Sequence, residues 1–310
     1  TKFVEIIDDG SGVFKPKNGE KAGTEIVGEG YKRERACYLA AMFLGLDVVK
    51  PTVIRDVKGR EGSLQEFIQN PRAYGELSDE ERIDKELSDQ VGKVALFDAL
   101  TGNIDRHSGN LILDENKKLW GIDHGDTFPK NSSIQSNIRA SGQNLTSFTF
   151  DNEDVEKLQA LNGDEAKKQA LRDNLSKLLG KKEVALFFKR LEVLAQNIEG
   201  CHITKTAIGT MLKKLRDFSQ KYDGEIEAFI KNREANELSE QQVADYLLEE
   251  KQAWAIIEYI HLFKKLNKET FLGILEADPD YAIVLELNLD SFEELDEKTI
   301  KKLKSHLEAI

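Results

Sequence analysis

Apolar residues recur every three to four positions through much of the second half of the chain, which is the spacing of amphipathic helices. Residues 184–198 follow this spacing closely, with apolar side chains at i, i+3, i+4 and i+7. Ser239 and Gln242 have the spacing of a capping box, which predicts one long helix from there to Leu266. From about residue 151 onward the chain is therefore predicted to be nearly all helix.

Shorter apolar runs separated by turn residues predict strands in the first 70 residues. Two strands are expected on either side of the turn DDGSG at 8–12, and two or three more between residues 46 and 68. A helix is expected over 29–45, with Gly45 as its C-cap. A hairpin, a helix and further antiparallel strands predict a small α+β lobe.

A buried helix and a β-hairpin are predicted in the middle of the chain. Ser78 and Glu81 form a second capping-box pattern, and apolar positions over 91–100 indicate a buried helix. Residues 111–122 contain two short apolar runs around a polar turn, as in a hairpin. We therefore expect an α+β chain with three regions: a sheet-containing lobe at 1–70, a mainly helical lobe at 71–200 and an all-helical extension at 201–310.

Composition limits the classes of function. With 310 residues, 40% hydrophobic content and a net charge of −12, the chain is typical of a globular protein and lacks the basic surface that nucleic acids require. Its longest uncharged apolar runs are shorter than the roughly 20 residues needed to span a bilayer, so no transmembrane segment is expected. Cys37 and Cys201 lie far apart in the sequence, which favours a cytosolic, reducing compartment over a disulfide-built fold.

A polar loop at 103–110 follows the predicted buried helix, and its side chains are poor core material. Asn110 immediately precedes the first strand of the hairpin and Asp123 follows the second, so both are expected at its open end. An amide oxygen and a carboxylate placed there suit Mg²⁺ or Mn²⁺ holding a phosphate. Taken singly, either residue would more often be a turn or cap residue.

The spacing within the loop favours the functional interpretation. Asp105 lies five residues before Asn110, as the base Asp and the metal-binding Asn do in the kinase catalytic loop. Asp123 begins the sequence Asp-His-Gly, in the place of the kinase Asp-Phe-Gly whose Asp binds the metal. Three matched positions around one hairpin predict a nucleotide–metal site.

The amino-terminal lobe contains candidates for the nucleotide contacts. Lys15 lies on a predicted strand after a glycine-containing turn, where a lysine of this kind reaches the phosphates. Glu34 on the following helix is its expected ion-pair partner, with Glu29 as the competitor. A solvated strand lysine and a surface glutamate are the plain alternative, which the downstream loop outweighs.

Two further segments are expected to contact the nucleotide. Gly10 and Gly12 belong to a turn whose main-chain N–H groups would face the phosphates, although it is not a G-x-G-x-x-G loop. Gln65 and Phe67 lie in the segment 62–68, which is expected to pass the adenine as the hinge between the lobes.

These motifs together resemble the phosphatidylinositol 3-/4-kinase-like family, and most of all the type II phosphatidylinositol 4-kinases and related bacterial kinases, some of them translocated effectors. The resemblance covers about residues 1–200 and is carried by VFKPKNGE at 13–20, GYKRERACYLAAMFLGLDVVKPT at 30–52, GNIDRHSGN at 102–110 and GIDHGDTFP at 121–129. It implies a two-lobed protein-kinase-like fold that uses ATP with Mg²⁺ or Mn²⁺. If the chain is an effector, it implies secretion into a host cytosol.

The family pattern implies specific roles for the matching residues. It makes Lys15 the ATP lysine, Asp105 the catalytic aspartate, Arg106 the residue that buttresses the loop, and Asn110 and Asp123 the metal ligands. His107 fits the family's Asp-Arg-His sequence, in which a neutral histidine can share the proton transfer near pH 7. His124 departs from the pattern, as does the short glycine turn, because family members usually have Phe or Asn at the position of His124.

The acceptor class depends on the loop after Asp123. An inositol headgroup calls for clustered cations, and this loop offers only Lys130 and Arg139, which favours a protein Ser/Thr hydroxyl. A phosphoinositide kinase, specifically a phosphatidylinositol 4-kinase, and a nucleotide-binding pseudokinase scaffold remain the alternatives. Basic patches at 181–190 and 205–221 are candidates for an inositol-phosphate or phosphoinositide regulator, with a core-packing helix as the plain alternative for the second.

Overall fold

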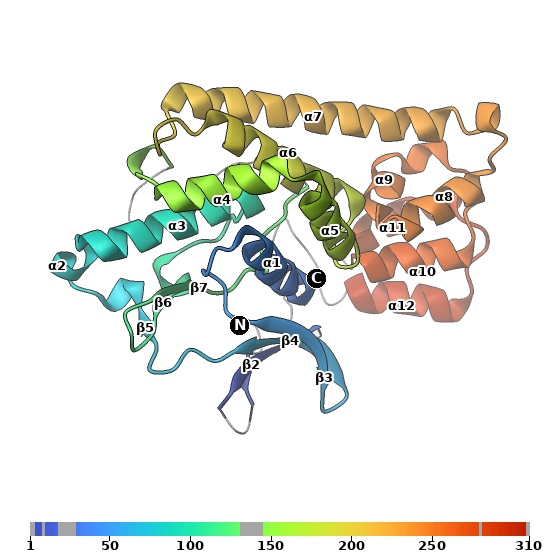
Figure 1. Cartoon of the computed structure of the whole chain (residues 1–310). Helices are drawn as coiled ribbons and strands as arrows, with labels where there is room; N and C mark the ends of the chain where they lie inside the picture. The colour runs from blue at the N-terminus through green and yellow to red at the C-terminus, as the bar shows by residue number, and fades with distance from the viewer. Residues whose placement is uncertain (1–3, 8–9, 18–28, 131–144, 279–280, 308–310) are drawn as a thin grey trace. The chain divides into compact units, whose positions relative to one another are not determined.

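A computed structural model of the chain describes residues 4–7, 10–17, 29–130, 145–278 and 281–307 (Figure 1). The described residues fall in two compact units. The first contains the N-terminal strands, residues 29–179 and residues 183–218, and the second contains residues 180–182 and the chain from 219 onward. The predicted region boundary at 200 stays a prediction, and the two units divide after Phe218, inside one helix.

The N-terminal part of the first unit is an antiparallel sheet with strand order β1-β2-β4-β3. Its strands are β1 (Glu5–Ile6), β2 (Gly12–Pro16), β3 (Thr52–Val57) and β4 (Arg60–Glu66). Side chains alternate along β2, so that Phe14 is fully buried while Lys15, opposite Ser63 of β4, lies on the other face. The predicted antiparallel N-terminal sheet is confirmed.

Helix α1 (Gly30–Leu44) packs against this sheet and against the helices that follow. It buries a small-residue face that includes Ala36, Cys37 and Ala40. Gly45 ends the helix as predicted, in the left-handed conformation at φ 71°, with its N–H directed at the carbonyls of Ala41 and Met42.

The centre of the first unit is helix α3 (Lys85–Thr101), which precedes a small sheet of β5 (Arg72–Ala73), β6 (Leu111–Leu113) and β7 (Leu119–Gly121). The hairpin between β6 and β7 is confirmed, with Leu111 opposite Gly121. The capping box of Ser78 is also present, but it caps the short helix α2 (Asp79–Arg82). A separate N-cap, Asp84, starts α3.

Four helices complete the first unit or lead out of it: α4 (Asn152–Gly163), α5 (Glu165–Ser176), α6 (Lys181–Asn197) and α7 (Lys205–Lys231). The apolar spacing predicted over 184–198 corresponds to α6, whose Phe187, Leu191 and Leu194 are fully buried. The mainly helical character of the chain after 151 is thereby confirmed, and with it the α+β class.

The second unit has its own core around Leu247, Ile256, Phe271 and Ile274. Its further helices are α8 (Glu240–Glu249), α9 (Ala253–Glu258), α10 (Lys268–Ala277), α11 (Ala282–Leu287) and α12 (Glu297–Leu307). None of the helices in the described part of the chain is both long and apolar enough to cross a membrane.

The prediction of one helix from Ser239 to Leu266 is wrong. Ser239 does cap α8, but α8 ends at Glu249, and Lys251 adopts a left-handed conformation at φ 55°. The Gln252 N–H then donates to the Leu247 carbonyl at 2.7 Å, which turns the chain before α9 starts. The apolar residues of α8 and α9 pack into the same core, so their combined pattern resembles a single continuous helix.

Candidate active site

Lys15 lies between two carboxylates that come from distant parts of the chain. Its Nζ forms an ion pair with Oε1 of Glu34 on α1 and a second one, at 3.2 Å, with Oδ1 of Asp123 after β7. Burial favours the neutral amine, but the charges of Glu34 and Asp123 outweigh it and raise the pKa of Lys15. Lys15 is therefore a permanent cation beside Asp123.

The choice between Glu34 and Glu29 as the partner of Lys15 is decided by the geometry. Glu34 is 2% exposed and points from α1 toward β2, whereas Glu29 pairs with Lys32 on its own helix turn. The structure brings Lys15 and Glu34 together as predicted.

Asn110 and Asp123 lie at the open end of the β6–β7 hairpin. The Ile122 N–H donates to the Asn110 carbonyl at 3.0 Å, which continues the ladder one step beyond the Leu111–Gly121 pair. Asp123 then turns out of the strand direction in a left-handed conformation at φ 56°. The hairpin thus places Asn110 opposite Ile122, the residue directly before Asp123.

The donor set of these two residues fits a hard divalent cation. Asn110 Nδ2 donates to the Asp105 carbonyl at 3.0 Å, so its amide Oδ1 is the atom left for a ligand. Asp123 adds a carboxylate. The described residues contain no group of three or more His, Cys, Asp or Glu side chains that could hold a metal by themselves. Two oxygen ligands are the number expected where substrate phosphates complete the coordination of Mg²⁺.

The loop at 103–110 alternates between exposed and buried side chains. Asp105 and His107 are exposed, whereas Arg106 between them is fully buried. The loop backbone is held at Asp105, whose N–H donates to Asn103 Oδ1 at 2.9 Å. The two candidate proton acceptors therefore face outward from a loop that is anchored inside.

Arg106 is the anchor of this loop. Its Nη1 donates to the carbonyls of Asn110 at 2.8 Å and Ile122 at 2.6 Å. One guanidinium thus fixes the peptide group of one candidate metal ligand and the residue directly before the other. The buttressing role that the family resemblance implies for Arg106 stays a prediction.

Asp98 is a functional candidate that the sequence analysis missed. This α3 carboxylate is fully buried, and it accepts hydrogen bonds from Arg106 Nε at 2.9 Å and Nη2 at 3.0 Å. The signal was present in the run VALFDAL, because a charged residue inside a buried helix requires a partner.

His124 belongs to the same buried network. Arg106 Nη2 donates to His124 Nδ1 at 3.1 Å, so the ring proton lies on Nε2 and is directed at the Gly121 carbonyl, also at 3.1 Å. Burial, and then the positive charge of Arg106, lower the pKa of His124 to about 3. The neutral His124 ring accepts a hydrogen bond from Arg106. This gives a physical reason for a histidine where family members usually have Phe or Asn.

The residues predicted to contact the phosphates and the adenine lie in the N-terminal sheet. Gly10 has φ 68° and open space at its Cβ position, whereas a Cβ on Gly12 would lie 2.7 Å from Leu64. Gln65 lies within β4 and donates through Nε2 to Thr52 Oγ1 at 3.0 Å, and Phe67 follows directly after the strand. Asp8 and Asp9 of the predicted turn lie outside the described residues. The nucleotide-contact roles predicted for four residues stay predictions: Gly10, Gly12, Gln65 and Phe67.

The comparisons with known proteins concern the same part of the chain. Residues 50–157 match the family Phosphatidylinositol 3- and 4-kinase. Protein Rv2133c of Mycobacterium tuberculosis is 27% identical in an alignment over 145 residues that covers 36% of this chain and 52% of that protein. Phosphatidylinositol 4-kinase gamma 4 of Arabidopsis thaliana is 33% identical in an alignment over 144 residues that covers 36% of this chain and 24% of the plant protein.

A solved structure adds a weaker similarity. The Helicobacter pylori proinflammatory kinase CtkA has 16% sequence identity and a TM-score of 0.41, over 68% of this chain and 97% of that one. This chain spans about half the length of Rv2133c and about a quarter of the Arabidopsis kinase. The family match covers Asp98, Asp105, Asn110 and Asp123, and over residues 50–157 it confirms the resemblance predicted from the sequence. Lys15 and Glu34 lie outside the matched segment.

Proposed function

We propose that this chain, which contains a phosphatidylinositol 3- and 4-kinase-like segment, is an ATP-dependent phosphotransferase that acts on a hydroxyl acceptor. The observation that carries the proposal is the contact of Lys15 with both Glu34 and Asp123. In kinases a lysine paired with a helix glutamate holds the ATP phosphates, and an aspartate holds the metal next to them.

Each residue of the site has one proposed role. Lys15 would neutralise phosphate oxygens of ATP, and Glu34 would hold the lysine in position. Asn110 and Asp123 would hold Mg²⁺ or Mn²⁺, which when bound screens the phosphate charge. The acceptor hydroxyl attacks the γ-phosphorus, the bond from that phosphorus to the ADP oxygen breaks, and the hydroxyl proton passes to Asp105.

Asp105 is a better candidate base than His107. The Gly109 N–H donates to His107 Nδ1 at 3.1 Å, so the neutral ring carries its proton on Nε2 and has no lone pair free for a substrate proton. The Asp105 carboxylate is exposed and makes no hydrogen bond to any residue that the structure describes. Asp105 can therefore accept a proton without first breaking an existing interaction.

A protein Ser/Thr hydroxyl is the proposed acceptor, with a phosphoinositide as the second candidate. The support is the small number of cations after Asp123, where Lys130 is exposed and Arg139 lies outside the described residues. The plant relative is named as a phosphatidylinositol 4-kinase, so phosphoinositides are tested beside protein as acceptors.

Labelled ATP with Mg²⁺ or Mn²⁺ tests the activity. The protein is incubated with cell-lysate protein in one reaction and with mixed phosphoinositides in another. Label should appear in one of the two, and Asp123→Ala should abolish it while Asp89→Ala, an exposed aspartate on α3, leaves it unchanged. Nucleotide binding without transfer to either acceptor would establish the pseudokinase scaffold instead.

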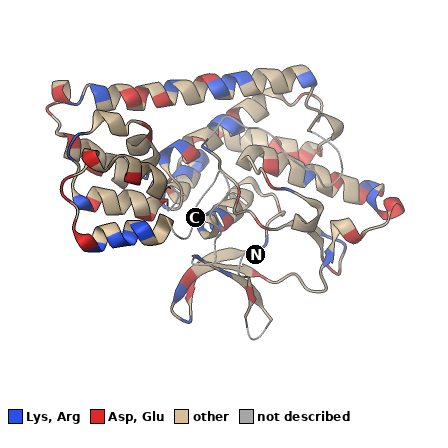
Figure 2. Ribbon diagram, turned by 180° about the vertical axis from the view of Figure 1, so that it is seen from behind, with Lys and Arg blue, Asp and Glu red and all other residues tan. Residues whose placement is uncertain are grey.

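A polyanionic regulator, an inositol phosphate or phosphoinositide, remains a proposal for the basic residues of α7. Lys213, Lys214 and Arg216 are exposed, and Figure 2 shows basic residues on the N-terminal half of this helix. Arg190 from the other predicted patch is fully buried and donates to the Pro129 carbonyl at 3.3 Å, so it is not available to a ligand. Unchanged anion binding after alanine substitution of Lys213 and Lys214 would reject the α7 site.

The cellular location is likewise a proposal. The cysteine content supports a cytosolic, reducing compartment, and an effector of the related bacterial kind would act in a host cytosol. Fractionation of cells that produce the tagged protein tests the first statement.

A further inference from the structure

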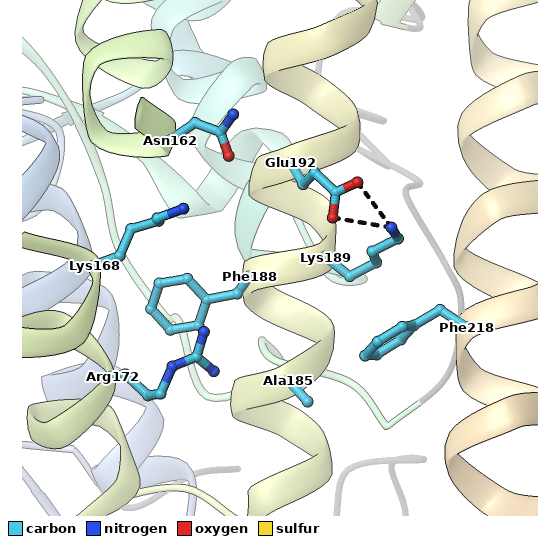
Figure 3. Close-up of a pocket in the computed structure, with 8 residues that line it drawn as sticks. All are labelled: Asn162, Lys168, Arg172, Ala185, Phe188, Lys189, Glu192 and Phe218. Carbon is cyan, nitrogen blue, oxygen red and sulfur yellow. Dashed lines mark hydrogen bonds and ion pairs between the residues drawn. The ribbon is translucent and has the colours of Figure 1, made fainter. Parts of the chain in front are cut away.

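A cavity of about 500 Å³ lies among helices α4, α5, α6 and α7 of the first unit (Figure 3). It shares no lining residue with the cluster around Lys15 and Asp123. Its lining combines charged, amide and aromatic side chains: Asn162, Lys168, Arg172, Ala185, Phe188, Lys189, Glu192 and Phe218. The proposed phosphotransferase reaction uses none of them.

Arg172 is the distinctive residue of this cavity. Its guanidinium carbon lies 4.0 Å from the centre of the Phe188 ring, and the two side chains lie together in Figure 3. Arg172 is half-buried and forms no hydrogen bond or ion pair with any residue in the described part of the chain. A guanidinium stacked on an aromatic ring still has N–H groups along its edge, which suit a carboxylate or a phosphate.

The two lysines of the cavity already have counter-ions. Lys189 Nζ lies 2.9 Å from both oxygens of Glu192, as drawn in Figure 3. Lys168 Nζ lies 2.6 Å from Oε1 of Glu165 on the same helix. Among the cations that line the cavity and that the structure describes, Arg172 alone lacks a carboxylate partner.

Most of the remaining lining is apolar, with Asn162 as its one amide. The Phe188 ring lies against Arg172, and Phe218 and Ala185 lie on the other side of α6 in Figure 3. A free inorganic anion would satisfy the charge but would leave these surfaces in water. A ligand that joins an anionic group to an apolar or aromatic body would satisfy both.

We propose that this cavity binds a small organic oxyanion, a carboxylate or phosphate monoester on an aromatic or apolar body, with Arg172 as the anion-binding residue. The site is separate from the proposed ATP site, so failure of one proposal would leave the other unaffected. A ligand here would contact helices α5, α6 and α7 together.

Binding of two simple probes tests the proposal and identifies the anion. Benzoate and phenyl phosphate are titrated separately into the full chain and followed by calorimetry or ligand-observed NMR, with inorganic phosphate as the probe without an apolar body. At least one organic probe should bind more tightly than inorganic phosphate. Arg172→Gln should weaken that binding at least tenfold, and Arg172→Lys, which keeps the charge but loses the planar fork, should also weaken it.

Lys167→Gln is the matched control, because Lys167 is an exposed cation on the same helix that does not line the cavity. It should leave the affinity unchanged. Equal affinities of the parent and both Arg172 variants would overturn the proposal, as would inorganic phosphate binding as tightly as the organic probes. Binding that is lost in Lys15→Met but kept in Arg172→Gln would place the probe in the other site and would overturn it too.

Discussion

The carboxylate of Asp98 meets the guanidinium of Arg106 side-on, with Nε–Oδ2 and Nη2–Oδ1 distances of 2.9 and 3.0 Å, and both side chains are fully buried. The remaining nitrogen of Arg106 reaches the carbonyls of Asn110 and Ile122. One buried ion pair thus connects helix α3 to the backbone on both sides of the open end of the hairpin. The geometry of the candidate metal ligands depends on it.

Asp98→Asn should destabilise the first unit. The substitution leaves the Arg106 charge buried without a counter-ion, and breaking a buried pair in this way costs about 3–5 kcal/mol. Urea unfolding measures the loss, with Asp89→Asn as the control on the exposed side of the same helix. A loss below about 1 kcal/mol would show that Arg106 does not depend on this carboxylate.

Loss of the Asp98–Arg106 pair should also change the metal concentration that phosphoryl transfer requires. If the pair only supports the fold, Asp98→Asn at a temperature where it remains folded should keep the parent affinity for Mn²⁺ with ATP. We expect instead a raised requirement for metal, because the peptide groups of Asn110 and Ile122 lose part of their anchor. The metal concentration that gives half-maximal transfer separates the two outcomes.

Lys15→Met should abolish most phosphoryl transfer by the folded protein. The substitution also leaves the buried Glu34 carboxylate without its lysine, so some loss of stability is expected and rates are compared where the variant is folded. Removing one preorganised charge at a reacting group costs about 10²- to 10³-fold in rate. Glu34→Gln should have a smaller effect, since it positions the lysine and does not touch the phosphates. Circular dichroism checks the fold, and transfer rates that equal the parent rate in Lys15→Met would rule out the proposed nucleotide site.

Comparison of Asp105→Asn with His107→Asn should identify the base. A general base contributes about 10²- to 10⁴-fold to the rate. We expect a loss of this size for Asp105→Asn and a much smaller one for His107→Asn, since His107 Nδ1 is used within the loop. The reverse order of effects would assign the base to His107.

Much of this site could be predicted from the sequence because its parts are defined locally. The alternation along β2 places Lys15 on the face opposite Phe14, and the hairpin length brings Asn110 opposite Ile122, the residue before Asp123. These relations depend on strand period and turn length, which the residue order contains directly.

The parts that escaped prediction depend on packing between distant segments. Asp98 looked like an interruption of an apolar run, and only the fold shows that Arg106 reaches it. The break after Glu249 escaped because α8 and α9 bury their apolar residues in one core, which preserves the helical spacing across the turn at Lys251. The cavity at Arg172 draws its walls from four helices, so no single stretch of sequence contains its pattern.

Acid should destabilise the chain partly through His124. Its pKa is about 3 in the folded protein and about 6.5 in an unfolded chain, so below pH 6.5 the unfolded state takes up a proton that the folded state does not. The stability that the neutral His124 ring contributes is complete above pH 6.5 and is lost as the pH falls toward 3. The loss in the free energy of unfolding reaches about 2 kcal/mol at pH 5. His124→Asn removes the titrating ring, so its free energy of unfolding should fall less between pH 7 and pH 5 than that of the parent.

The control for this titration is His202→Asn, which removes an exposed histidine elsewhere in the same unit. It should retain the pH dependence of the parent. Equal slopes for the parent and His124→Asn would contradict the neutral buried ring.

The end of helix α1 supplies a prediction that is independent of catalysis. Gly45 has φ 71°, and a Cβ built there would meet only the Lys157 side chain at 3.9 Å, so Gly45→Ala adds backbone strain without a steric clash. A left-handed conformation costs a non-glycine residue about 1–2 kcal/mol, and we expect that loss in the free energy of unfolding. Gly163→Ala, at the last residue of α4, has open space and no positive φ, and should be neutral or slightly stabilising. If both variants unfold at the same denaturant concentration, Gly45 does not hold the end of α1 in the conformation described.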